Sequence, residues 1–429
     1  MFSVFIEHYK NNEKLRLFTK IIVVWLLSRI VMQAMVPVMN LVADTPHNLL
    51  YYMNPWDAEW YKELAEEGYK LPRSSGMANW AFFPLYPMVC ALIRIITGGY
   101  INTYAIGMLV SNICIIIAVY YAVRFAWLEL DTDKYDRVDI ENIIIFLMFA
   151  GPCAVYYGSM YTESLFTMCV VLCFYNTKKK NYMMAGVSAA LASATRIVGC
   201  TLIVVLFTDM YVSMYKQHRD EERRIVAAIK AFIKDVISDA GKLLALAICP
   251  LGIFVYMTFL RGFCGDAWAF YHVQKAWRTQ KLFPVIGVLI KSCTGRLGEM
   301  SDVKQINGII LGWLCVFTLL MYVIMLVRKH YACGIFGIIA LMIPLTSSVM
   351  STLRFIVGSF VDYRSPAFNR QKYKACYYGT SCSCRGYMYI GMVFLGWTAY
   401  VTLKLNSNVQ KHALCILCEN TCELYIKVL

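Results

Sequence analysis

The segment Ile21–Val42 reads IIVVWLLSRIVMQAMVPVMNLV, an almost unbroken apolar run. A bilayer core of about 30 Å is crossed by a helix of about 20 apolar residues, so this run is long enough for one membrane span. Four basic residues precede it, Lys10, Lys14, Arg16 and Lys20. Because Lys and Arg accumulate on the cytoplasmic side of membrane spans, we expect a cytoplasmic N-terminus and an uncleaved signal anchor.

The composition of the whole chain agrees with a membrane protein. Of 429 residues, 59% are hydrophobic and only 16% are charged, and the mean hydropathy is +0.54. The net charge of +14 is what basic cytoplasmic loops supply, so we expect no nucleic-acid partner. The seventeen cysteines are an odd number, and many lie in apolar runs where they act as small hydrophobic residues rather than as a disulfide framework.

Apolar runs recur along the chain and predict an all-α polytopic membrane protein with about 8–11 transmembrane helices. A long first exterior loop is expected from Ala43 to about Gly99, before Ile101–Val123 crosses back. The later passes and the second exterior loop are predicted, in chain order, at Lys242–Leu260 (pass), Arg261 to about Gln305 (loop), Ile306–Val327 (pass) and Tyr331–Met350 (pass).

The region Asn142–Tyr215 holds more apolar length than two helices need. Polar interruptions, among them those at Glu163 and Arg196, lead us to interpret it as four short passes. This interpretation places the charged stretch Lys216–Arg224 in the cytoplasm, in agreement with the positive-inside rule. Glu163 and Arg196 then lie on the exterior side, together with the first exterior loop.

Most of the unusual polar and aromatic motifs therefore fall on one face of the membrane. A scaffold or an anchor has no reason to gather costly polar residues at one depth. Such a gathering is typical of a catalytic or binding cavity that opens to one side.

The richest motif lies in the first exterior loop and reads Asn54-Pro55-Trp56-Asp57-Ala58-Glu59-Trp60-Tyr61. Its pattern predicts a helix with Asn54 as N-cap, Pro55 in the first position and Gly68 just past the end. Aromatic residues follow one side of this helix and charged residues the other, so we expect it to rest in the membrane interface. Asp57 is then either a carboxylate favoured by the helix dipole or a base at the level of lipid head groups.

An aromatic block with two prolines, Trp80 to Pro87, continues the same loop. It fits either an aromatic belt at the bilayer surface or a rigid wall of a lipid or sugar site. Five motifs then occur in order: Trp56-Asp57, Phe82-Phe83-Pro84-Leu85-Tyr86-Pro87, Tyr161-Thr162-Glu163-Ser164-Leu165-Phe166, Ala194-Thr195-Arg196, and the segment from Gly265-Asp266 to Trp277. With these motifs the sequence resembles, over roughly residues 10–360, the PIG-V family, the mannosyltransferases that add the second mannose in GPI-anchor biosynthesis, and their bacterial relatives.

The resemblance implies a GT-C-type glycosyltransferase domain over residues 1–360. Such an enzyme takes a sugar, here mannose, from a polyprenyl-phosphate donor at the non-cytoplasmic surface and passes it to a lipid-linked or surface glycan. An acidic residue of the first exterior loop is then the catalytic base, and Asp57, beside Trp56, occupies the matching place. The resemblance implies no cofactor beyond the donor substrate. It implies a multi-pass protein among membrane lipids, in a bacterial cell membrane or, in a eukaryote, in the endoplasmic reticulum membrane.

Arginines are the candidates for binding the phosphate of the donor, because their planar fork pairs with phosphate through two hydrogen bonds. Arg196 and Arg354 lie at exterior ends of apolar segments, although both also fit residues that snorkel to the interface. Arg29 lies deeper, within the first membrane helix, and its alternative is a structural pairing with Glu163. Glu163 is in turn either a substrate contact or a member of a buried ion pair.

The second exterior loop adds Gln274 and Trp277 as candidate sugar contacts, although a solvated loop has a similar composition. No metal site is predicted, since the chain has no His-Glu-x-x-His motif and no His pair at helical spacing. One Asp-x-Asp motif occurs, Asp131-Thr132-Asp133. It falls in a loop expected in the cytoplasm, across the membrane from Asp57, and we interpret it as part of a solvated charged loop.

The C-terminal segment 361–429 departs from what precedes it. Six cysteines lie in this segment, at positions 376, 382, 384, 415, 418 and 422, in a spacing that matches no standard zinc site. Only Tyr387–Leu403 is able to cross the membrane. The segment is therefore treated as a divergent Cys-rich unit with one possible transmembrane helix, from a shifted reading frame or from strong divergence.

Two other functions stay open at this point. A lipid or polysaccharide transporter also places aromatic and charged residues in a membrane cavity, but it is expected to have pseudo-symmetric halves, and no convincing internal repeat is visible. A non-catalytic partner subunit keeps the fold and loses the activity. The intact Asp57 counts against the partner subunit, and the aberrant C-terminal segment counts for it.

Overall fold

The computed structural model describes residues 12–42, 45–130, 136–151, 154–218, 224–276, 285–296, 302–346 and 349. Every regular element within these ranges is a helix, which confirms the all-α class. Two predicted substrate contacts, Trp277 and Arg354, lie outside the described residues. So do the Asp131-Thr132-Asp133 motif and the predicted C-terminal unit.

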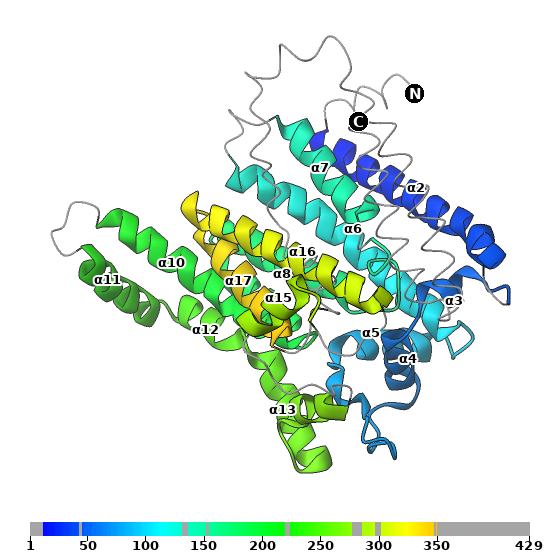
Figure 1. The fold of residues 1–429 in the computed structure, drawn as a ribbon. Coiled ribbons are helices and arrows are strands. Elements are labelled where there is room, and N and C mark those ends of the chain that lie inside the picture. The colour runs from blue at the N-terminus through cyan, green and yellow to red at the C-terminus, as the bar shows by residue number, and fades with distance from the viewer. Residues whose placement is uncertain are drawn as a thin grey trace, which may run out of the picture.

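The helices follow one another in an order that Figure 1 labels from blue to yellow. In chain order they are α2 (Glu13–Val42), α3 (Leu49–Met53), α4 (Asp57–Glu67), η1 (Asn79–Ala81), α5 (Leu85–Ile96), α6 (Thr103–Glu129), α7 (Arg137–Ala150), α8 (Glu163–Lys178), α9 (Tyr182–Ser193), η2 (Ile197–Leu202), α10 (Ile203–Gln217), α11 (Arg224–Ser238), α12 (Ala240–Ile248), α13 (Leu251–Cys264), α14 (Ala269–His272), η3 (Val273–Ala276), α15 (Val285–Cys293), α16 (Asp302–Val327) and α17 (Tyr331–Leu345).

Helices α6 and α8 form the centre of the bundle. Helix α8 buries side chains on nearly every side, whereas α6 buries one broad face and leaves Leu109 and Ile113 exposed. The two helices pack against each other, α2, α5 and α7 also pack on α6, and α9 and α10 pack on α8. The short helices α3, α4 and α5 gather near one end of the bundle, where α13 also projects (Figure 1).

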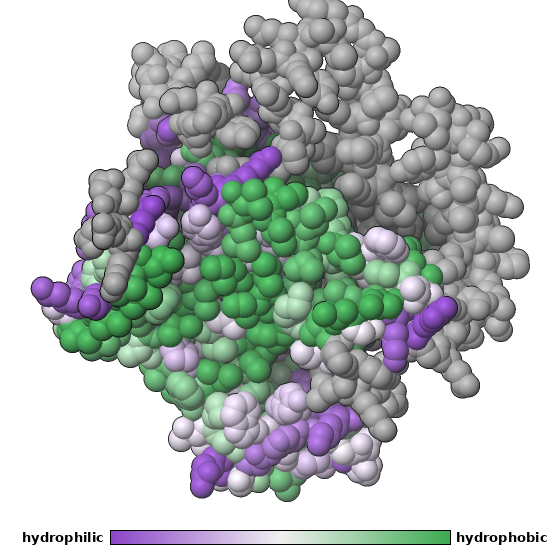
Figure 2. Space-filling model, turned by 60° about the vertical axis from the view of Figure 1, so that its left-hand side comes forward, coloured by the Kyte–Doolittle hydropathy of each residue, from purple (hydrophilic) through white to green (hydrophobic). Residues whose placement is uncertain are grey.

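The bundle has the dimensions and the surface of a membrane protein. Four described helical stretches are long and apolar enough to span a bilayer: Glu13–Leu41, Thr103–Glu129, Ile197–Gln217 and Gly308–Val327. The bent pair α12 and α13 counts as a fifth if it is one span, and α5, α9 and α17 are shorter apolar helices. Figure 2 shows a broad hydrophobic surface across the middle of one face, with hydrophilic residues towards its edges. The protein is therefore a multi-pass membrane protein.

The predicted division of Asn142–Tyr215 agrees with the structure, since the region contains the four helical segments α7, α8, α9 and η2–α10. The pass predicted at Lys242–Leu260 is divided between two helices, α12 and α13, which together form one bent candidate span. The chain bends by 47° between α12 and α13, where Pro250 stands at the N-cap position of α13. Proline has no N–H to donate and its ring clashes with the preceding turn, so an otherwise apolar run breaks there.

Helix α9 packs against its neighbours at backbone distance. A Cβ added at Gly186 would overlap the carbonyl of Ala245 in α12, and one added at Gly252 in α13 would overlap the backbone at Ala190. Small residues at such positions let membrane helices approach closely. Helix α9 is therefore fixed between α12, α13 and α8 by contacts that no larger side chain permits.

Candidate active site

Helix α4 carries Asp57 as its first residue and ends before Gly68, which has φ 74°. The end at Gly68 agrees with the prediction, because only glycine adopts this backbone region without strain. The predicted start is wrong: Trp56, not Asn54, holds the N-cap position, with φ 48°. A bulky residue at positive φ is strained, by about 1–3 kcal/mol, and such strain persists only where the surroundings enforce it.

Asn54 does not cap α4 because its side chain is used elsewhere. The Asn54 Oδ1 atom accepts a hydrogen bond from the backbone N–H of Met160 at 2.7 Å, and its Nδ2 donates to the carbonyl of Leu50 at 2.8 Å. The phenol of Tyr161 donates to the carbonyl of Pro55 at 2.5 Å. These bonds join the turn before α4 to the loop before α8, so the first residues of the two helices are held together.

The first residue of α8, Glu163, forms an ion pair with Arg196, with 3.1 Å between Oε1 and Nη1. The pair is almost fully buried, with exposed side-chain fractions of 3% for Glu163 and 12% for Arg196. Arg196 precedes η2 in extended backbone, and its guanidinium also lies over the ring of Phe166 at 5.8 Å. Of the two predicted alternatives for Glu163, the geometry fits the buried ion pair.

Tyr61 connects Asp57 to this pair. The side chain lies one helical turn after Asp57, is buried, and its hydroxyl is 3.4 Å from the hydroxyl of Thr162. Burial raises the pKa of the Tyr61 phenol, the charges of Glu163 and Asp57 raise it further, and the charge of Arg196 lowers it. Three of the predicted site residues therefore act electrostatically on one neutral phenol.

Aromatic rings from the predicted block line this region. Phe82 stacks on Trp60 with 5.7 Å between ring centroids and meets Tyr61 edge to face at 5.1 Å. Tyr86 is fully buried behind them and donates to the carbonyl of Gly107 at 2.8 Å. The guanidinium of Arg73 lies over the ring of Trp60, 4.1 Å from its centroid. The block thus packs against α4, and its predicted role as a wall of a lipid or sugar site stays a prediction.

Arg29 reaches the same loop from α2. Its Nη1 atom donates to the sulfur of Met32 at 3.1 Å, and a Cβ added at Gly158 would overlap that nitrogen. Within the described residues, Nε and Nη2 of Arg29 are buried without a hydrogen-bond partner. The predicted alternative of a pairing with Glu163 is wrong, because Glu163 pairs with Arg196 while Arg29 lies against Gly158.

The segment after α13 contacts the segment between α4 and α5 through its short helices. Helix α14 and η3 pack on η1, and His272 pairs with Asp266 at 2.6 Å. Hydrogen bonds from His272 and from the N–H of Trp268 lower the pKa of Asp266. Gln274 lies half-buried on η3, and within the described ranges it has no hydrogen bond to the charged residues around Tyr61. The prediction that it contacts substrate stays a prediction.

Sequence patterns missed Tyr61 and Asn54 as residues of the site. Tyr61 was assigned only to the aromatic face of α4, although its spacing of four from Asp57 places both on one side of the helix. Asn54 was assigned only a local capping role. The partners of both residues lie about 100 positions further along the chain, and no local pattern reports such contacts.

The arrangement combines the groups that a group-transfer reaction requires. The carboxylate of Asp57, at the start of a helix, can accept a proton. The guanidinium of Arg196, held in place by Glu163, can bind an anion. The aromatic rings beside α4 can stack on a sugar or an isoprenoid. Within the described part of the chain, no group of three or more His, Cys, Asp or Glu side chains is arranged to hold a metal ion.

Comparisons with known proteins place this geometry in a family. The family model described as mannosyltransferase (PIG-V) matches residues 28–289, which is more than half of the chain. The matched range contains Arg29, Asp57, Glu163 and Arg196. No curated protein and no solved structure matches the chain significantly.

Proposed function

Because the chain belongs to the mannosyltransferase (PIG-V) family, we propose that it transfers mannose from a polyprenyl-phosphate-linked donor to a lipid-linked or surface glycan on the non-cytoplasmic side of the membrane. The family and the membrane-spanning helices make it a membrane glycosyltransferase. The proposal adds three points to this: the donor, the side of the membrane and the acceptor.

One observation carries the proposal: the hydrogen bonds from Met160 to Asn54 and from Tyr161 to Pro55 join the turn before α4 to the loop before α8. They bring the helix start at Asp57 towards the buried ion pair of Glu163 and Arg196. These residues come from the starts of three different helical elements, α4, α8 and η2. The N-termini of α4 and α8 bring partial positive charge to the same place. A negatively charged donor phosphate is stabilised by such a setting, and the carboxylate of Asp57 stands at its edge.

The reaction assigned to these residues is a single displacement at the anomeric carbon. The acceptor hydroxyl oxygen forms the new bond to C1 of the mannosyl group, and its proton passes to the carboxylate of Asp57, which acts as general base. The bond from C1 to the phosphate oxygen breaks, and that oxygen keeps the electron pair. Arg196 stabilises the departing phosphate, and Glu163 holds Arg196 in place.

The distribution of basic residues supports the proposed side of the membrane. Helix α8 begins at Glu163 and ends at Lys178, which is followed by Lys179 and Lys180. The ends of α10 and α16 that pack beside Lys178 carry Lys216 and Lys329. Since basic residues mark the cytoplasmic side, the end with Asp57 and Glu163 faces the other compartment.

The acceptor is proposed from the family. A GPI-anchor intermediate that already carries one mannose is the acceptor proposed in a eukaryotic endoplasmic reticulum, and a surface glycan is the acceptor proposed in a bacterial membrane. In both cases the acceptor is anchored in or lies at the same leaflet as the donor, which matches a site at the end of the bundle.

The function is tested with the purified full chain in lipid nanodiscs. Polyprenyl-phosphate mannose labelled in the sugar is supplied with a lipid extract as acceptor, and the labelled product is separated from the donor. We expect label in a glycolipid or glycan together with released polyprenyl phosphate, and no transfer when GDP-mannose replaces the lipid donor. Transfer from GDP-mannose alone, or no consumption of the lipid donor, contradicts the proposal.

A further inference from the structure

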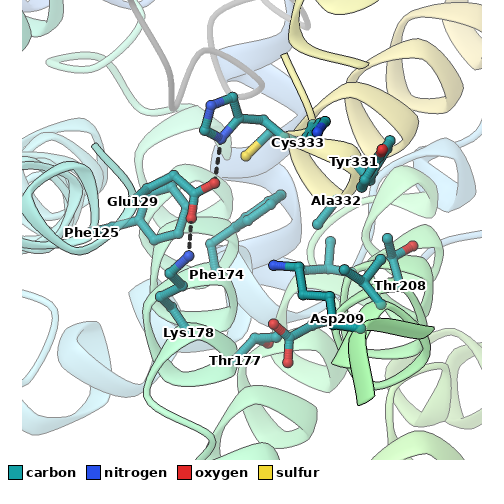
Figure 3. A pocket seen from close by; sticks show the side chains of 15 residues that line it. Phe125, Glu129, Phe174, Thr177, Lys178, Thr208, Asp209, Tyr331, Ala332 and Cys333 are labelled. Carbon is teal, nitrogen blue, oxygen red and sulfur yellow. Dashed lines mark hydrogen bonds and ion pairs between the residues drawn. The ribbon is translucent and has the colours of Figure 1, made fainter. Parts of the chain in front are cut away.

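A polar cavity lies at the end of α8 opposite to the candidate site. It has a volume of about 110 Å³ and lies where the ends of α6 and α8 meet α10 and the turn between α16 and α17 (Figure 3). Helix α8 spans sixteen residues from Glu163 to Lys178, which is about 22 Å at about 1.5 Å per residue. The cavity is therefore separate from the region around Asp57.

The two carboxylates that line the cavity are already neutralised. Glu129 accepts hydrogen bonds from Lys178 and from the ring of His330, the two contacts drawn in Figure 3. Asp209 accepts from Lys180 at 2.6 Å and from the hydroxyl of Tyr182 at 2.9 Å. A metal cation would have to compete with these donors, so the cavity is unsuited to a cation.

The lining also holds two further exposed lysines. Lys216 and Lys329 line the cavity, and neither forms an ion pair with any described residue. The hydroxyl of Thr177, a residue that is 3% exposed, also faces the lining. Apart from the neighbouring thiol of Cys173, this hydroxyl has no hydrogen-bond partner among the described residues. Two ammonium groups and one buried hydroxyl are donors that suit an oxyanion.

The backbone at Lys329 strengthens this inference. Lys329 has φ 68° in the turn that ends α16, where His330 N–H donates to the carbonyl of Met325 at 2.9 Å. Glycine is the usual residue at such a helix end, and a lysine there is strained. A cation that only balances the helix dipole is already supplied by Arg328, whose backbone is not strained. The turn therefore places Lys329 in the lining of the cavity at a small cost in backbone strain.

We propose that this cavity binds one phosphate group, held by Lys216, Lys329 and the hydroxyl of Thr177. The volume equals that of three or four water molecules at about 30 Å³ each, which admits a phosphate group. The phosphate belongs either to the head group of an anionic phospholipid in the adjacent leaflet or to a free phosphate ion. The proposal is independent of the mannosyl-transfer reaction.

The experiment measures binding and not activity. The full chain in phosphatidylcholine nanodiscs is titrated with radiolabelled inorganic phosphate, and in parallel it is extracted from mixed phosphatidylcholine and phosphatidic acid nanodiscs for native mass spectrometry. Two variants remove the proposed contacts, Lys216→Ala and Lys329→Gly. Arg328→Ala is the matched control, because it removes the same charge from the same helix end without lining the cavity.

Binding of the phosphate ion identifies a soluble ligand, and retention of phosphatidic acid alone identifies a lipid head group. For either probe we expect affinity to fall about tenfold or more in Lys216→Ala and Lys329→Gly, and to stay unchanged in Arg328→Ala. The glycine variant keeps the turn and should melt at an equal or higher temperature than the wild type. If it fails to fold, Lys216→Ala decides alone. Absence of binding for both probes, or equal binding by all variants, overturns the proposal.

Discussion

The side-chain oxygen of Asn54 accepts a hydrogen bond from the backbone N–H of Met160 across 106 positions of the chain. The bond joins the turn that leads into Asp57 to the loop that leads into Glu163. Arg196 balances the charge of Glu163, and the N-terminal ends of α4 and α8 favour a carboxylate at each helix start. The location of Asp57 thus depends on a contact made by its neighbour.

The first prediction concerns the proposed general base. Asp57→Asn keeps the size of the side chain and most of the hydrogen bonding at the start of α4, so it should cost no more than about 1 kcal/mol of stability. Turnover should fall about 10²-fold or more, because the amide cannot accept the proton. Glu59→Gln is the control, since Glu59 is exposed and bonded to Lys62 and Tyr104. Transfer near the wild-type rate in Asp57→Asn would remove this mechanism.

The second prediction concerns phosphate recognition. Arg196→Lys keeps a positive charge beside Glu163 but loses the planar fork, so donor use, measured as kcat/KM, should weaken by about 1–3 kcal/mol. The same exchange at Arg261, at the end of α13, should leave donor kinetics unchanged. Wild-type kinetics in Arg196→Lys would reduce the pair of Glu163 and Arg196 to a structural role.

The third prediction concerns Arg29 and Gly158. A methyl group at position 158 would overlap the guanidinium of Arg29. Because the obstructing atom is the end of a flexible side chain, Gly158→Ala should displace Arg29 at a cost of about 1–3 kcal/mol and lower the transfer rate. Gly262→Ala is the matched control, since nothing lies within 4 Å of its added Cβ. Melting temperature and turnover are measured for both variants. Equal melting temperatures and equal turnover would show that Arg29 moves aside at no measurable cost.

The fourth prediction uses the pKa of Tyr61. Burial raises this pKa above its ordinary value of 10.0, so above pH 10 the unfolded chain loses the phenolic proton before the folded protein does. The neutral phenol of Tyr61 therefore contributes fully to the free energy of unfolding below pH 10. This contribution is lost as the pH rises from 10 towards the pKa of Tyr61 in the folded protein. Tyr61→Phe removes this contribution. The melting temperature of the variant should therefore fall less between pH 7 and about pH 10.5 than that of the wild type. Tyr271→Phe, at an exposed position, should follow the wild type; identical curves for all three would contradict the assignment.

The fifth prediction concerns orientation. A cysteine at His218, at the end of α10, should resist an impermeant maleimide added to intact cells or sealed vesicles with the native outside facing out, in a background without the native cysteines. A cysteine at Glu67, at the end of α4, should react. The reversed pattern would place the candidate site on the cytoplasmic side and exclude the proposed donor.

The sequence predicts those features of the fold that depend on local pattern. The length of the apolar runs predicted a multi-pass helical protein, and the glycine at position 68 predicted the end of α4. The start of α4 was misplaced because the side chain of Asn54 bonds to Met160 and not to its own helix. Arg29 was matched with the wrong alternative partner for the same reason. Charge and depth predict that a buried cation needs a partner, but they do not say which residue supplies it.

Helix α9 sets limits on how the protein moves. Its backbone touches the backbones of α12 and α13 at Gly186 and Gly252, so a rotation or a slide of one helix past another meets carbonyl and amide atoms and not pliable side chains. Ala194, which follows α9, also accepts a hydrogen bond from the backbone of Leu85 at the start of α5. We therefore expect this part of the bundle to behave as a rigid body during turnover. Under the proposed function, entry and exit of the substrates then require motion in the segments between α4 and α5 and after α13, and we expect this motion to be faster than any rearrangement of the spans.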